Sequence, residues 1–436
     1  MDRSGKLNVR TLLGLTAIAL LCKLVVFFLS IRTSMSFSLP FAENWQDFSL
    51  AYVPAADAFK SGFAPYGDFY YPYPPLFLYA LTSFSYLPLP SWSSALPLVI
   101  ADALTVVPVY LLARELVSER YSLIASIAFV LAPINLYYVD YLWLNPSLTT
   151  LFLMVSVYFL IKRRFDLSAV SLALSIGFKQ TALLALPIIM IVVWRSLSRR
   201  GAMRYLLITA SICFLISVPY IFLSPGPYLY SVFRVPLDFW WGIGQWPPNY
   251  FQIGVGTGTA TTPDTLNWIT SRWNLIVQGI GMPVTLALPM FIFLLPTTLS
   301  WVYDPYSTGL LLLILLAGYA ALLYRTRRNR HIEEKDSLRY VLYGLLLLFA
   351  FYPLYKYYAV GIIPIFALLM RSKRDALGFT AFNFALMLIP RYFASWVLLI
   401  SLLWLLRHHL AGLLRKPISP TSQNAAGLPQ TDLMKA

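Results

Sequence analysis

The sequence predicts an all-α, polytopic membrane protein with about 12–14 membrane segments of roughly 20 residues each. Hydrophobic residues make up 59% of the 436 residues, and charged residues make up only 12%. Soluble domains contain about 25% charged residues, so this chain has too little charge to cover a surface in water. These observations exclude a soluble globular enzyme, and they also exclude an intrinsically disordered chain.

The expected membrane segments follow the apolar runs of the sequence. Several runs are shorter than about 20 residues, and a tilted or broken helix accommodates this. We expect one membrane domain over 1–416 and a disordered polar tail over 417–436, because the tail is rich in polar residues. The apolar runs are 12–31, 95–114, 121–139, 146–161, 167–178, 181–194, 205–223, 306–324, 340–353, 357–370, 376–390 and 392–406.

The net charge of +15 is expected to come from cytoplasmic loops and not from a nucleic-acid-binding surface, because basic residues are enriched on that side of membrane proteins. If all basic clusters are cytoplasmic, two large outer loops remain, at about 32–94 and 224–305. The apolar stretch 275–300 then crosses the membrane twice or not at all. The clusters are 3–10, 114–120, 162–164, 195–204, 325–339, 371–374 and 407–416.

No metal, cofactor or nucleotide site is expected. Cys22 and Cys213 lie in apolar runs, and the three histidines have no ligand spacing. The sequence lacks a P-loop, which argues against an ATP-driven pump.

Asp47 is the first candidate for chemistry, because it follows the first apolar run at the start of the first outer loop. A carboxylate near the membrane surface can take a proton from a sugar hydroxyl. The alternative is that Asp47 caps an amphipathic helix over 48–61, since Asp is a good N-cap. The two roles can coexist.

Further candidates are ionisable residues at the outer ends of the apolar runs. Lys179 is expected at the outer tip of a tight helical hairpin, and Lys356 ends another run on the same side. Such a cation can bind a lipid phosphate, or it can extend to the lipid headgroups. Asp140, with Asn145, is either functional or an anchoring cap. Asp102 lies inside a span, where a charge is costly and favours a functional role.

Several blocks, in order, resemble the polyprenyl-phosphate-dependent glycosyltransferases of the C superfamily (GT-C), most of all the dolichyl-phosphate-glucose α-1,3-glucosyltransferases of lipid-linked oligosaccharide assembly. Two departures are Leu354-Tyr355, where the family has His-Glu, and Tyr52, where it has Arg after the catalytic Asp. The blocks are Gln46-Asp47-Phe48, Tyr73-Pro74-Pro75-Leu76, Ile100-Ala101-Asp102, Ala132-Pro133 through Asp140-Tyr141 and Asn145, Phe178-Lys179-Gln180 with Leu186-Pro187, Phe233-Arg234-Val235-Pro236, and Lys356 before Pro364.

The resemblance implies a GT-C helical bundle whose active site lies where the first outer loop meets the membrane. It implies inverting transfer of a hexose from dolichyl or polyprenyl phosphate to a lipid-linked glycan, with Asp47 as general base and without a metal. The residues implied at the donor phosphate are Lys356, Lys179 and Arg391. Those implied at the substrates are Tyr66, Tyr73, Asp140, Asn145, Gln180 and Arg234.

Two other functions stay open from the sequence. One is a lipid-linked sugar flippase or small-molecule transporter, although no internal repeat typical of transporters is visible. The other is a GT-C enzyme that acts on protein or on a surface polymer. The compact loops favour a prokaryotic, above all archaeal, plasma membrane, and the endoplasmic reticulum is the eukaryotic alternative.

The charge pattern predicts that 32–94 and 224–305 face away from the cytoplasm. A membrane-impermeant thiol reagent should therefore label Ser61→Cys and Thr259→Cys variants from outside intact cells. Labelling of either variant only after permeabilisation contradicts the predicted orientation.

Overall fold

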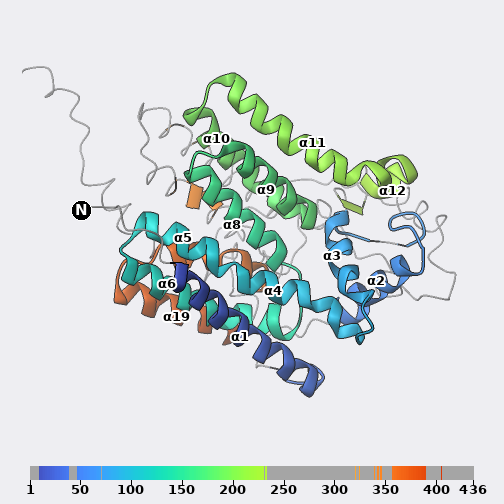
Figure 1. Ribbon diagram of the computed structural model, residues 1–436, viewed down its shortest axis with the longest axis horizontal. Helices are drawn as coiled ribbons and strands as arrows, with labels where there is room; N and C mark the ends of the chain where they lie inside the picture. The colour runs from blue at the N-terminus through green and yellow to red at the C-terminus, as the bar shows by residue number, and fades with distance from the viewer. Residues whose placement is uncertain are drawn as a thin grey trace, which may run out of the picture.

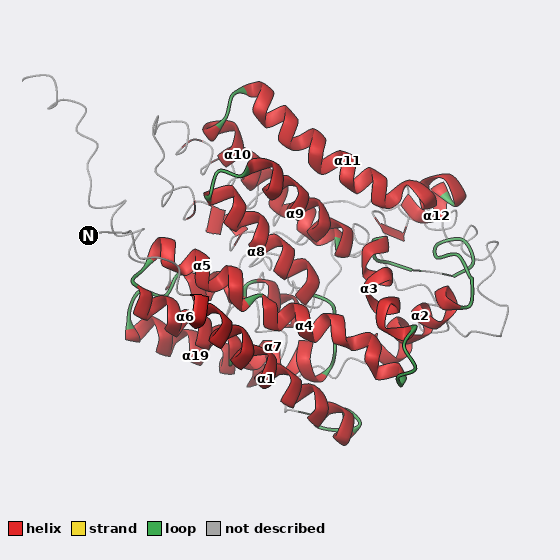
Figure 2. Cartoon of the chain, viewed as in Figure 1, coloured by secondary structure: helices red, strands yellow, loops and turns green. Residues whose placement is uncertain are grey.

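The computed structural model describes residues 9–38, 47–69, 71–229, 231–232, 320, 324, 338, 341–342, 344–345, 356–388 and 404. Within these residues the chain is helical, and the only β-type pairing among them is an isolated bridge between Pro65 and Phe69 (Figure 2). The predicted all-α class is therefore confirmed. The stretch 275–300 and the tail 417–436 lie outside the described residues, as do nearly all of 306–324, 340–353 and 392–406.

The apolar runs in the described part form helices close to their expected limits. Four segments there are long and apolar enough to cross a membrane: Val9–Thr33, Ser91–Leu116, Glu119–Tyr141 and Arg199–Leu223. The longer helices are α1 (Val9–Thr33), α4 (Leu96–Leu104), α5 (Val106–Leu116), α6 (Glu119–Val130), α8 (Ser147–Ile161), α9 (Phe165–Phe178), α10 (Leu186–Ser196), α11 (Arg199–Leu223) and α19 (Lys373–Leu388).

Short helices fold the first outer loop against the bundle. The expected helix over 48–61 is present as a π-helical turn, η1 (Phe48–Tyr52), followed by α2 (Val53–Lys60). The apolar segment after Pro74 forms α3 (Pro75–Ser85), which starts at a proline because the first turn needs no amide donor there. The remaining short elements are η2 (Ser91–Ala95), α7 (Pro133–Asn135), η3 (Leu136–Tyr141), η4 (Gln180–Ala185), α12 (Pro225–Leu229), η6 (Lys356–Gly361) and α18 (Ile363–Leu368).

The two ends of the bundle differ in chemistry. In Figure 1 the connection between α10 and α11 lies at the left, whereas α2, α3 and α12 gather at the right. Two exposed ion pairs involve residues of the basic clusters 162–164 and 195–204. Lys162 lies 2.5 Å from Glu115, and Arg204 lies 2.6 Å from Asp166. The first loop thus lies at the end opposite to these basic turns, and the side of the membrane that each end faces stays a prediction.

A buried ion cluster fastens α1 to the middle of the bundle. The Lys23 ammonium lies 2.5 Å from the Asp102 carboxylate on α4 and 2.9 Å from the Asp140 carboxylate on η3, and none of the three side chains is more than 1% exposed. Asn135 donates a 2.7 Å hydrogen bond to Asp102. The sequence did not single out Lys23, because it is one cation in an apolar run. It did single out Asp102 and Asp140, the two acidic residues that pair with Lys23 in the structure.

Replacing Lys23 with Met should destabilise the fold by about 3–5 kcal/mol, because it leaves two carboxylates buried without their cation. Lys162→Met is the matched control, since it removes an exposed pair of the kind that contributes about 0–1 kcal/mol. The unfolding free energies of both variants can be measured in mixed micelles by titration with dodecyl sulfate. Equal stabilities would show that the cluster is not required for the fold.

Candidate functional site

Asp47 begins η1 and its side chain is almost enclosed, with 7% of the residue exposed. The backbone at Asp47 is already helical (φ −54°, ψ −34°), and the carboxylate accepts no capping hydrogen bond. Asp47 therefore occupies the N-cap position of η1 without a capping hydrogen bond from its side chain. Burial raises the pKa of Asp47 to about 6, and the positive charge of Lys179 opposes this rise. The carboxylate is thus a stronger base than an exposed Asp.

Lys179 lies at the hairpin tip that the sequence predicted. It ends α9 in an extended conformation (φ −154°, ψ 124°), and η4 starts at the next residue. Gln180 donates a 2.9 Å hydrogen bond to the Pro72 carbonyl, which ties this tip to the first loop. Lys179 is only 4% exposed, so an extension of its ammonium to lipid headgroups is excluded.

Three tyrosine rings surround the Lys179 ammonium. Its Nζ lies 4.4 Å from the ring centre of Tyr358, 5.3 Å from that of Tyr357 and 5.9 Å from that of Tyr73. Such rings stabilise a cation through their negative faces. Burial lowers the pKa of Lys179 to about 7, although the Asp47 charge opposes this shift. Both charged groups of the site therefore titrate near neutral pH.

The tyrosines predicted at the substrates differ in position. Tyr73 lines the Lys179 site, and its hydroxyl lies 3.4 Å from that of Tyr52. Tyr66 donates a 2.6 Å hydrogen bond to the Tyr73 carbonyl and packs against Tyr220 and Tyr228. Tyr66 thus supports Tyr73 from within the protein.

Lys356 is buried at the start of η6 and donates a 3.2 Å hydrogen bond to the Met387 carbonyl on α19. An extension to lipid headgroups is therefore excluded for Lys356 as well. Its bond to α19 helps to place the next two residues, Tyr357 and Tyr358, beside Lys179. A contact between Lys356 and a donor phosphate stays a prediction, and the predicted residues Arg234 and Arg391 lie outside the described residues.

A set of buried polar side chains lies at the start of α8. Asn145, Ser147 and Thr149 have side-chain atoms without a hydrogen-bond partner in the described part of the chain. The Ser175 hydroxyl donates a 2.8 Å bond to the Thr149 carbonyl, one turn before Lys179. Buried polar groups without a partner are rare, and a helix N-terminus favours an anion. This set is therefore a candidate anion site beside Lys179.

Asp140, which was predicted at the substrates, is instead paired with Lys23 in the buried cluster. Lys23 pairs with Asp102 and Asp140. The charge of Asp47 interacts instead with that of Lys179. No group of three potential metal-binding side chains occurs in the part of the chain that the structure describes.

Comparisons with known proteins gave a match to one family model and matches to solved structures. A family model described as ALG3 protein matches residues 92–254. The oligosaccharyltransferase of Archaeoglobus fulgidus has a TM-score of 0.45 at 14% identity, and the match covers 88% of this chain but only 55% of that protein. ArnT from Cupriavidus metallidurans, solved with undecaprenyl phosphate, has a TM-score of 0.36 at 15% identity, covering 92% of this chain and 78% of that one. No curated protein matches the sequence.

The matched residues of the family model include four of the blocks that resemble GT-C enzymes, from Ile100-Ala101-Asp102 to Phe233-Arg234-Val235-Pro236. This match supports the resemblance of these blocks to GT-C enzymes. The apolar helices make the chain an integral membrane protein.

The site predicts a bell-shaped pH dependence of kcat/KM for sugar transfer. The rate should rise as Asp47 loses its proton at about pH 6 and fall as Lys179 loses its proton at about pH 7. These values describe the interacting pair and not either residue alone. Lys179→Arg should remove the alkaline limb up to pH 10, since arginine stays charged. An unchanged alkaline limb in this variant would exclude Lys179 as its source.

Proposed function

We propose that the protein transfers a hexose from dolichyl or another polyprenyl phosphate to a lipid-linked glycan on the non-cytoplasmic side of the membrane. The observation that carries this proposal is that Asp47 and Lys179 are both buried, at 7% and 4% exposure, and that their charges interact, with pKa values of about 6 and about 7. A base and a cation that titrate near the working pH suit proton transfer combined with stabilisation of an anion.

In the proposed reaction Asp47 accepts the proton of the acceptor hydroxyl. The hydroxyl oxygen forms a bond to the anomeric carbon of the donor sugar, and the bond from that carbon to the phosphate oxygen breaks on the opposite face. The configuration is therefore inverted, and the electron pair leaves with the polyprenyl phosphate. The leaving phosphate is already an anion, so it needs a cation more than a proton donor.

Lys179 is the best-placed cation for this phosphate, because its charge interacts with that of Asp47 and because Ser175, one turn before it, bonds to Thr149 at the start of α8. Asn145, Ser147 and Thr149 supply polar atoms that lack partners in the described structure. A phosphate at this helix start interacts favourably with the backbone amides. Lys356 and Arg391 are proposed as further phosphate contacts, and Tyr73 and Gln180 as the wall of the sugar site.

The identity of the hexose is a finer point. The sequence blocks resemble glucosyltransferases, whereas the family model describes mannosyltransferases that use dolichyl-phosphate mannose. Both use a polyprenyl-phosphate hexose, so the reaction scheme is the same. A panel with dolichyl-phosphate mannose and dolichyl-phosphate glucose separates the two possibilities.

Asp47→Asn tests the base directly. Because asparagine keeps the size of the side chain but cannot accept the proton, turnover should fall by at least about 10²-fold. Transfer of radiolabelled hexose from each donor of the panel to lipid extracts of the source cell measures this. Asp57→Asn is the matched control, since Asp57 is an exposed acid of the same loop. An Asp47→Asn protein with full activity removes the assignment, and a wild-type protein without transfer favours the transporter alternative.

A further inference from the structure

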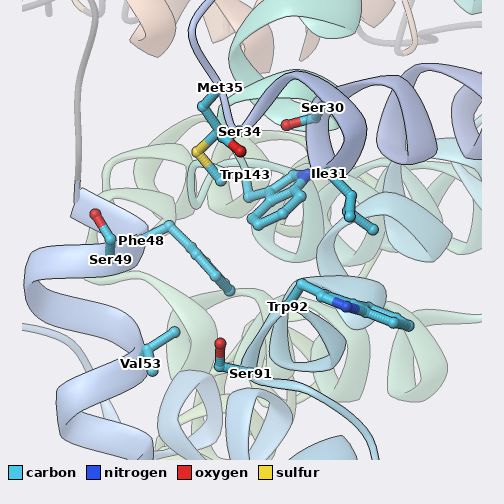
Figure 3. A pocket seen from close by; sticks show the side chains of 10 residues that line it. All are labelled: Ser30, Ile31, Ser34, Met35, Phe48, Ser49, Val53, Ser91, Trp92 and Trp143. Atoms are coloured by element: carbon cyan, nitrogen blue, oxygen red, sulfur yellow. The ribbon is translucent and has the colours of Figure 1, made fainter.

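A cavity of about 520 Å³ lies against the η1 segment. Phe48 and Ser49, which directly follow Asp47, form part of its wall (Figure 3). Cavities that bind small molecules have volumes of about 300–1,000 Å³. The remaining lining residues are Ser30, Ile31, Ser34, Met35, Val53, Ser91, Trp92 and Trp143.

The lining of this cavity combines aromatic and aliphatic side chains with hydroxyl groups, and none of its described residues is charged. Figure 3 shows the rings of Phe48, Trp92 and Trp143 around one space, with the Ser91 hydroxyl directed toward it. The Trp143 indole donates a 3.0 Å bond to the Asp140 carbonyl, so its ring is held in place. Phe48 meets Trp143 edge-on, with ring centres 4.7 Å apart.

Strained backbone is concentrated at the same cavity. Of the five non-glycine residues with positive φ in the described chain, three line it: Ser34 (φ 50°), Met35 (φ 56°) and Trp143 (φ 57°). Such conformations cost about 1–3 kcal/mol each and persist where the surroundings enforce them, often at ligand sites. The Ser30 hydroxyl also bonds to the Tyr141 carbonyl at 2.5 Å, which joins this wall to η3. The cavity is therefore a shaped site and not a gap between loose loops.

From this lining we infer that the cavity binds a neutral saccharide, which we assign to the sugar part of the acceptor. A sugar ring offers an apolar C–H face to an aromatic ring and hydroxyls at its rim to serines. A phosphate is disfavoured because the lining has no cation. A lipid tail is disfavoured because it would offer no hydrogen-bond partner to the Ser34 and Ser91 hydroxyls of the lining. The assignment to the acceptor rests on the proposed function, whereas the saccharide class rests on the lining alone.

The test uses the full chain in nanodiscs and mannotriose as the probe. Saturation-transfer difference NMR should show contact of the sugar C–H protons with the wild-type protein. Ser91→Phe fills the cavity and Trp92→Leu removes one ring, so each should weaken binding at least about tenfold. Trp194→Leu is the matched control, because Trp194 is an exposed residue of α10, and it should bind as the wild type does.

Asp47→Asn separates this proposal from the proposed function. It should lose sugar transfer and keep mannotriose binding. Binding that is equally strong in Ser91→Phe and Trp92→Leu overturns the assignment, and so does the absence of binding to the wild-type protein for both mannotriose and maltotriose. Displacement of bound mannotriose by undecanol but not by unlabelled trisaccharide would assign the cavity to a lipid tail. Normal transfer together with failed binding would contradict the cavity assignment alone.

Discussion

The ion cluster of Lys23, Asp102 and Asp140 is the constraint on which the rest of the structure depends. Three charged side chains are buried in the middle of an apolar bundle, where an unpaired charge is very costly. Their pairing therefore restricts the relative positions of α1, α4 and η3. The position of η3 matters for the site, because Tyr138 of η3 packs against Tyr357 of η6. Through this contact the cluster helps to position η6, whose Tyr357 and Tyr358 rings lie against the Lys179 ammonium.

Burial explains the shifted pKa values of Asp47 and Lys179. The rings around Lys179 exclude water from the ammonium and stabilise its charge, while the same burial raises the pKa of Asp47. The described lining of the cavity at Phe48 and Ser49 has aromatic, aliphatic and hydroxyl groups but no charged one. The proposed charged donor therefore suits the site of Asp47 and Lys179, and the proposed neutral acceptor sugar suits this cavity.

The sequence predicted the helices well, because the length of an apolar run follows from the thickness of a bilayer. It also predicted the hairpin tip at Lys179 and the position of Asp47 after the first span. It did not predict that the charges of these two residues interact, since this interaction depends on how the first loop folds back onto α9. Lys23 was missed because a single lysine in an apolar run has no pattern of its own. Tyr66 and Tyr73 both lie in the first outer loop, and only packing distinguishes their positions.

The central claim is that Asp47 and Lys179 work as one unit, and a double-mutant cycle tests it most directly. Single-turnover rates of hexose transfer should be compared for the wild type, Asp47→Asn, Lys179→Met and the double variant. Residues that act together show strongly non-additive losses. The double variant should therefore be about as slow as the slower single variant. Losses that multiply across the two sites would contradict the account.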